Sequence, residues 1–142
     1  MPDSLFCKPS VLVIEDESTQ RHMLQNQLMV QGYEAMVSSN GPEGLEIWSQ
    51  HPEIRLVMTD IAMPGMDGVE VIKAIRSQEK HPTYLMVLTS LEQKEWLLKA
   101  LAAGADDFVH KPVLWEELHL RLQGAQRLLR LKDQDKLVGS LA

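Results

Sequence analysis

Short apolar runs separated by polar segments recur along the whole chain. Between these runs, apolar residues recur at helical spacing, as do Met23, Leu24 and Leu28 before Gly32. The apolar runs have the length and composition of buried strands and cover residues 11–14, 33–37, 56–59, 84–88 and 107–110. Strand and helix thus alternate five times, which predicts an α/β fold: a doubly wound, five-stranded parallel sheet with helices on both faces.

Helix boundary signals agree with this alternation. Ser18 or Thr19 can cap the first helix, and Asp67 is placed to cap a helix over residues 69–76. Gly104 is expected to stop the helix that follows the fourth strand.

The C-terminal segment is predicted to be a long helix from Val113 onward. Its apolar stripe consists of Leu114, Leu118, Leu122, Ala125 and Leu129. Two interpretations stay open for residues 125–142: the frayed end of one amphipathic helix, or a helical extension that dimerises or leads toward an output domain. We therefore assign residues 10–124 to the folded domain and residues 125–142 to a helical extension or linker.

Composition fits one globular domain. The chain has 142 residues, of which 44% are hydrophobic and 24% charged, and no apolar run approaches the roughly 20 residues of a membrane span. Residues 1–9 lack the pattern of a signal peptide and are predicted to be a disordered lead-in. A single cysteine, Cys7, cannot form an internal disulfide, which fits a reduced, cytoplasmic compartment.

The net charge of −6 limits the classes of partner. Phosphate binding by nucleic-acid-binding proteins requires clustered Lys and Arg, so no direct nucleic-acid binding is expected of this domain. An acidic balance is compatible with a divalent cation held by carboxylates.

Polar residues gather where the predicted strands end. They are Glu15 and Asp16 after the first strand, Asp60 after the third, Thr89 after the fourth and Lys111 after the fifth. The carboxyl ends of parallel strands converge on one edge of such a sheet, so these side chains are expected to share one site. Carboxylate oxygens select Mg²⁺ or Mn²⁺, and a lysine beside them suits phosphate. The cluster can therefore accept a phosphoryl group on a carboxylate.

Other interpretations of these residues fit less well. Asp60 alone can be a cap or turn residue, but five such residues at strand ends of one sheet argue for a common site. A phosphatase with an aspartyl nucleophile needs a second acid two residues on, where this chain has Ala62. A nucleotide-binding domain needs a glycine-rich turn after the first strand, where this chain has Glu15-Asp16-Glu17.

From Ser10 to Leu122 the chain resembles the receiver (CheY-like) domain of bacterial two-component response regulators. The matching motifs are Glu15-Asp16, the T-D-I-A-M-P-G-M-D-G block around Asp60, Thr89-Ser90, and G-A-D-D-F-V-H-K-P, which ends in Lys111-Pro112. The resemblance implies the flavodoxin-like strand order 2-1-3-4-5 and a cis peptide bond before Pro112. Glu15 departs from the family, which more often has Asp there.

The resemblance also implies roles for single residues. Asp60 is the implied phosphoacceptor, and Lys111 the lysine that contacts the phosphoryl group. Glu15, Asp16, Asp60 and the backbone carbonyl of Ala62 are the implied Mg²⁺ (or Mn²⁺) ligands. Thr89 is the implied switching hydroxyl and Phe108 the switching aromatic. No residues are assigned to an organic cofactor.

The implied function is that of a phosphorylation-dependent signalling switch rather than a free-standing enzyme. A sensor histidine kinase or histidine phosphotransfer protein is the implied donor. Phosphorylation would change the face made by the fourth helix, the last strand and the fifth helix, to control an output domain or partner. This face and the C-terminal helix are candidate homodimer interfaces. The alternative is a receiver-like interaction module that works without phosphorylation.

Overall fold

The computed structural model describes residues 9–141, and the side chains of residues 9–133. The lead-in predicted for residues 1–9, with Cys7, lies outside this range except for Pro9. Five strands form one sheet: β1 (Ser10–Ile14), β2 (Glu34–Ser38), β3 (Ile54–Asp60), β4 (Tyr84–Thr89) and β5 (Asp107–His110). All neighbouring pairs are parallel, in the order β2-β1-β3-β4-β5. The predicted α/β fold and strand order are therefore confirmed.

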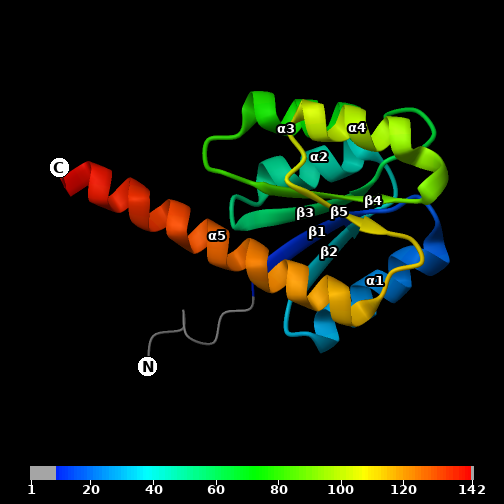
Figure 1. The fold of residues 1–142 in the computed structure, drawn as a ribbon, viewed down its shortest axis with the longest axis horizontal. Helices are drawn as coiled ribbons and strands as arrows, with labels where there is room; N and C mark the ends of the chain where they lie inside the picture. Colours follow the sequence, from blue (N-terminus) through cyan, green and yellow to red (C-terminus); the bar gives the residue numbers. More distant parts are fainter. Residues whose placement is uncertain (1–8, 142) are drawn as a thin grey trace.

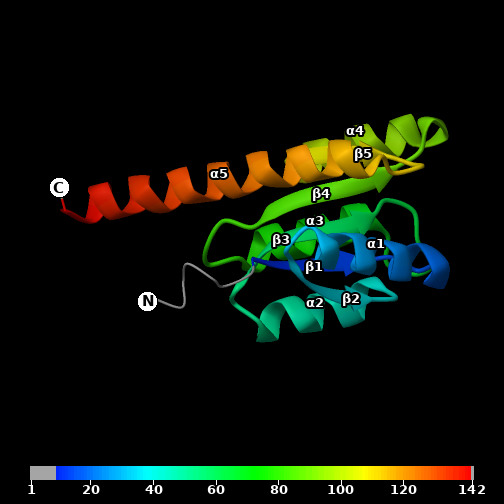
Figure 2. The same ribbon diagram turned by 90° about the horizontal axis from the view of Figure 1, so that it is seen from below.

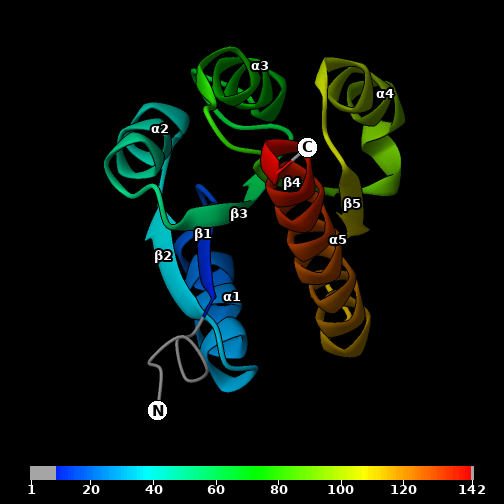
Figure 3. The ribbon, with the colours of Figure 1, turned by 90° about the vertical axis from the view of Figure 1, so that its left-hand side faces the viewer.

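Helices cover both faces of the sheet. They are α1 (Ser18–Val30), α2 (Gly41–Gln50), α3 (Gly68–Gln78), α4 (Lys94–Ala103) and α5 (Trp115–Leu141), with a short 3₁₀ helix η2 (Leu91–Gln93) before α4. Figure 3 shows α2, α3 and α4 on one face and α1 and α5 on the other. None of the described helices combines the length and apolar character needed to cross a membrane.

Two apolar clusters hold these layers together. One lies under α1 and α5 and includes Val11, Met58, Met86 and Leu118. The other lies under α2, α3 and α4 and includes Leu12, Val57, Ile72, Leu85 and Ala100. Because side chains alternate along a strand, adjacent residues such as Val11 and Leu12 serve opposite faces.

Helix starts follow local capping chemistry. Asp67 caps α3 as predicted: its side chain accepts the Glu70 N–H at 2.9 Å, within a capping box. For α1 the predicted cap, Ser18 or Thr19, is wrong. Glu17 takes this place, and its carboxylate accepts the N–H groups of Thr19 and Gln20 at 3.3 and 2.6 Å.

Helix α5 runs unbroken past the body of the domain (Figures 1 and 2). Its residues Ala125 and Leu129 belong to the cluster under α1 and α5, and Gln126 donates to the Tyr33 hydroxyl at 2.5 Å. Further on, Asp133 pairs with Arg55 at the start of β3. The helix therefore contacts the domain as far as residue 133, with no break at residue 124.

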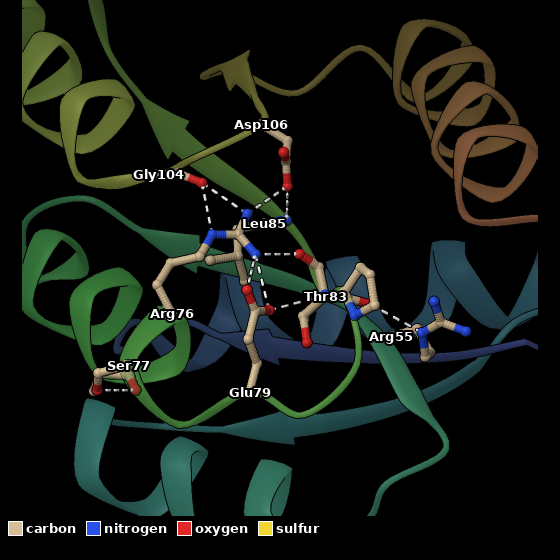
Figure 4. Close-up of polar contacts among 10 residues, drawn as sticks. Arg55, Arg76, Ser77, Glu79, Thr83, Leu85, Gly104 and Asp106 are labelled. Carbon is tan, nitrogen blue, oxygen red and sulfur yellow. Dashed lines mark hydrogen bonds and ion pairs between the residues drawn. The ribbon is translucent and has the colours of Figure 1, made fainter. Parts of the chain in front are cut away.

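A network of hydrogen bonds and ion pairs around Arg76 stabilises the amino edge of the sheet, meaning the side on which the strands begin (Figure 4). The Arg76 guanidinium donates to the Gly104 carbonyl at 2.7 and 3.0 Å and to the Thr83 carbonyl at 2.7 Å. It also pairs with Glu79 at 3.0 Å and Asp106 at 2.7 Å. Arg76 thus joins the end of α3 to the start of β4 and to the segment between α4 and β5.

Candidate functional site

Three carboxylates meet at the carboxyl edge of the sheet. Glu15 and Asp16 follow β1, and Asp60 ends β3, the neighbour of β1. One oxygen from each lies within 4.8 Å of the others. Glu15 and Asp60 are 1% and 2% exposed, whereas Asp16 is open to solvent. The structure thus brings together the acids that the sequence pattern placed at this edge.

Lys111 reaches this cluster from the end of β5. Its Nζ atom lies 3.1 Å from Glu15 Oε1 and 2.5 Å from Asp60 Oδ1. The contact with Asp60 is an ion pair without hydrogen-bond alignment, because Asp60 Oδ1 has no aligned donor among the described residues. The Lys111–Pro112 peptide bond is cis, as the resemblance implied.

Burial and crowding shift the pKa values of this group. Burial, followed by the neighbouring Glu15, raises the pKa of Asp60 to about 9, although Lys111 opposes the shift. Burial also favours the neutral form of Glu15, yet Asp60, the Glu17 N–H and Lys111 together lower the pKa of Glu15. For Lys111 burial opposes the charge, but the two carboxylates raise its pKa. Without a further cation, Asp60 therefore holds a proton at neutral pH, between an ionised Glu15 and a charged lysine.

Backbone packing fixes the two acidic strand ends. The Glu17 N–H donates to Glu15 Oε2 at 3.1 Å, and Arg21 donates to the Glu15 carbonyl at 2.9 Å. Behind Asp60, α3 begins so close that a Cβ atom on Gly68 would clash with the Asp60 carbonyl oxygen. Only glycine fits at this first position of α3, so Gly68 lets the helix pack directly against the end of β3.

The remaining predicted residues differ in their burial and contacts. Thr89 is fully buried at the end of β4, and its hydroxyl oxygen lies 3.2 Å from the Ser90 carbonyl and 3.4 Å from Gln93 Oε1. Phe108 is half-buried on β5; its ring meets His110 edge-on at 5.2 Å and the Arg121 guanidinium at 5.6 Å. Ala62 lies in the exposed turn after Asp60.

Comparison with known families agrees with this geometry. Residues 11–123 match the model of the response regulator receiver domain. The chain belongs to this family. It is therefore a receiver domain of the kind found in two-component systems.

Relatives of this receiver domain occur in proteins of several kinds. The chain is 35% identical to the regulatory protein AtoC of Escherichia coli over 87% of its own length and 26% of AtoC. It is 34% identical to a cyclic di-GMP phosphodiesterase of Thermotoga maritima, over 83% of the chain and 31% of that protein. The probable transcriptional regulator ycf27 of Cyanidium caldarium is matched over 48% of its length. The receiver domain thus spans between about a quarter and about a half of these curated relatives.

Solved structures share the fold over most of their length. A response regulator receiver domain protein from Clostridium thermocellum superposes with a TM-score of 0.81 at 28% identity, over 86% of this chain and 97% of that one. The chemotaxis protein CheY4 of Vibrio cholerae gives a TM-score of 0.76 at 30% identity, over 84% and 99% of the two chains.

The acidic edge of this receiver domain has the character of a divalent-cation site. It combines three carboxylates within 4.8 Å, one of which has its pKa raised by burial and by Glu15, with a buried oxygen that lacks an aligned donor among the described residues. Hard oxygen ligands of this kind suit Mg²⁺ or Mn²⁺.

Sequence reasoning missed one residue next to the site. Gln93 accepts the Ser90 N–H at 2.9 Å and lies within reach of the Thr89 hydroxyl. The spacing Ser90-x-x-Gln93 is that of a capping box, a signal that could have drawn attention to it.

Proposed function

We propose that this receiver domain is a phosphorylation-dependent switch whose phosphoacceptor is Asp60. The observation that supports this most directly is the state of the Asp60 carboxylate: buried, beside Lys111, and with one oxygen that no aligned donor engages. A structural carboxylate at this depth would normally have its oxygens hydrogen-bonded. An oxygen left without such a donor, beside a cation, can act as a nucleophile.

In the proposed reaction, an oxygen of Asp60 attacks the phosphorus of a phosphohistidine. The new P–O bond forms as the P–N bond breaks, and the partner's imidazole leaves with the bonding electron pair. Lys111 stabilises the charge on the phosphoryl oxygens, and the Thr89 hydroxyl then donates a hydrogen bond to one of them. Water later cleaves the acyl phosphate to inorganic phosphate and the free carboxyl group. The domain thus assists its own phosphoryl transfer without being a free-standing enzyme.

The proposed ligands of Mg²⁺ or Mn²⁺ are Glu15, Asp16, Asp60 and the Ala62 carbonyl. When bound there, the cation supplies positive charge to the transferring oxygens. Binding requires an ionised Asp60, so it competes with the protonated form that burial and Glu15 favour. Glu15 already has a lowered pKa and is held by Lys111 and the Glu17 N–H, which keeps it ionised and oriented.

The donor is proposed to be a sensor histidine kinase or a histidine phosphotransfer protein. Beside Lys111 lies a hollow of about 310 Å³ between α1 and the start of α5, lined by Met23, Leu24, Pro112 and Trp115 among others. Met23 is 50% exposed there. An apolar surface next to the reacting groups can seat a partner that brings a histidine to Asp60. We propose a cytoplasmic location for the domain, in keeping with such a donor and with the sequence prediction.

We propose that phosphorylation changes the surface formed by α4, β5 and α5. Movement of Thr89 toward the phosphoryl group would let Phe108 turn inward and repack this face. Apolar residues are already exposed on α4: Trp96 is 41% exposed and Leu98 58%, while Leu97 packs against the core. Leu120 and Leu131 are exposed along α5. An output domain, a partner or a second copy of the chain can use these surfaces.

The test is intact mass after incubation with acetyl phosphate, with and without Mg²⁺. We expect the wild-type protein to gain one phosphoryl group only with Mg²⁺, and Asp60→Asn to gain none, since a carboxamide cannot form the acyl phosphate. If the small donor fails, a phosphorylated histidine partner replaces it. Absence of an adduct from both donors would overturn the proposal and favour an interaction module that works without phosphorylation.

A further inference from the structure

The hydroxyl of Thr89 points toward acceptors on the α4 side of the site. Its two neighbours, the Ser90 carbonyl and Gln93 Oε1, are both acceptors, so the single proton of the Thr89 hydroxyl is shared between them. At 3.2 and 3.4 Å these contacts are longer than the roughly 2.5–3.0 Å of strong O–H···O bonds. The hydroxyl is therefore held weakly enough to be released.

Gln93 is itself fixed in place. Its Oε1 atom accepts the Ser90 N–H at 2.9 Å, and its own backbone N–H donates to the Ser90 carbonyl at 3.0 Å. These two bonds close the turn between β4 and η2. Gln93 also ends η2 directly before Lys94, the first residue of α4. One carboxamide oxygen thus connects the buried hydroxyl of Thr89 with the entry into α4.

We propose that Gln93 is a positioning residue that holds Thr89 in its unphosphorylated orientation and sets how readily the phosphorylated state forms. This rests on the proposed function, because it presumes that Thr89 turns toward a phosphoryl group on Asp60. Turning breaks the contact with Gln93 Oε1, so that contact stabilises only the unphosphorylated state. By contrast, the Ser90 N–H bond can persist in both states.

The test measures affinity for beryllium trifluoride, a stable phosphoryl mimic, in the presence of Mg²⁺ and on the full 142-residue chain. Gln93→Leu removes the acceptor and should bind the mimic about threefold more tightly, in keeping with the loss of one weak hydrogen bond. Glu92→Gln is the matched control: it lies on the same turn, is exposed, and should leave affinity unchanged.

A double-mutant cycle separates positioning from simple turn stability. In a Thr89→Val background, which lacks the hydroxyl, Gln93→Leu should have no effect on affinity. If the effect persists there, Gln93 acts only through the Ser90 turn and the proposal is wrong. The proposal is equally wrong if Gln93→Leu does not tighten binding when Thr89 is present.

A second measurement does not depend on the phosphoryl mimic. The Thr89 methyl resonance of the free protein should shift in Gln93→Leu and in the shorter Gln93→Asn, but not in Glu92→Gln. An unchanged resonance in both Gln93 variants would overturn the proposal even if one of them folds poorly. Failure of the proposed function would look different, because the wild-type protein itself would then neither bind the mimic nor gain mass.

Discussion

The two edges of the sheet carry the same kinds of charge and use them differently. At the amino edge, Arg76 faces Glu79 and Asp106; at the carboxyl edge, Lys111 faces Glu15 and Asp60. In each group one cation thus pairs with two carboxylates, and at the carboxyl edge Asp16 lies nearby as a third acid. Around Arg76 the acids are 21% and 27% exposed, whereas Glu15 and Asp60 are almost completely buried.

The number of hydrogen-bond donors differs as well. Glu79 also accepts the Thr83 N–H at 3.0 Å, and Asp106 accepts the Leu85 N–H at 2.8 Å. The planar fork of Arg76 serves both acids and two carbonyls at once, which the point charge of a lysine cannot do. The two groups thus differ in burial and in hydrogen-bond donors, although in each of them one cation pairs with two carboxylates.

The largest expected effect on stability comes from removing the brace at the amino edge. Arg76→Met should lower the free energy of unfolding by about 3 kcal/mol, because it removes the donor to the Gly104 and Thr83 carbonyls and the cation that pairs with Glu79 and Asp106. Urea unfolding checks this. Lys73→Met, an exposed change one turn earlier on α3, should stay within about 0.5 kcal/mol. Equal losses in the two variants would contradict the role given to Arg76.

At the carboxyl edge, stability should instead depend on pH. In the folded protein the pKa of Asp60 is raised to about 9 from its ordinary 3.8, so the folded state keeps a proton that the unfolded chain gives up. Stability without Mg²⁺ should therefore fall steadily as pH rises from about 4 toward 9. Glu15, with its lowered pKa, contributes in the opposite sense: its stabilisation is present above pH 4.5 and is lost as the pH falls below it.

Asp60→Asn is the control for this titration. It removes the group with the raised pKa, so its stability in Mg²⁺-free buffer should stay nearly level from about pH 5 to 8 and exceed that of the wild-type protein at about pH 8. Added Mg²⁺ should raise wild-type stability most at high pH, since the cation needs ionised carboxylates. A wild-type curve parallel to that of Asp60→Asn would show that Asp60 has an ordinary pKa.

Features of the two edges that depend on short-range interactions or on strand order can be predicted from the sequence. The alternation of strands and helices, the cap at Asp67 and the convergence of acids on one edge depend on local pattern or on topology, and the structure agrees with them. Glu17 was not predicted as the N-cap of α1 because Glu is not among the residues preferred at that position. The early start of β3 at Ile54 was hidden by Arg55, which interrupts the apolar run.

The Arg76 network could not be predicted, for a physical reason. In the sequence, Arg76 and Glu79 have the spacing of an ordinary solvated ion pair on a helix surface. No neighbouring residue indicates that Arg76 also contacts Gly104 and Asp106, about 30 residues later. In the same way, Arg55 shows no sign in sequence of its partner Asp133, which follows 78 residues later.

The smallest expected effect concerns this last pair, which ties α5 to the amino edge. Arg55 donates two parallel bonds to the Asp133 carboxylate at 3.0 and 3.1 Å, with side chains 26% and 55% exposed. Solvent screening limits such a pair, so Asp133→Asn should cost only about 0.5 kcal/mol. Its local effect should be clearer: amide exchange in residues 126–133 should speed up severalfold, because a contact between α5 and the start of β3 weakens there. The neighbouring Lys132→Gln should change neither quantity. If exchange in this segment does not respond to Asp133→Asn, then packing of Leu129 and the Gln126–Tyr33 bond suffice to hold the helix, and the Arg55 pair has no structural role.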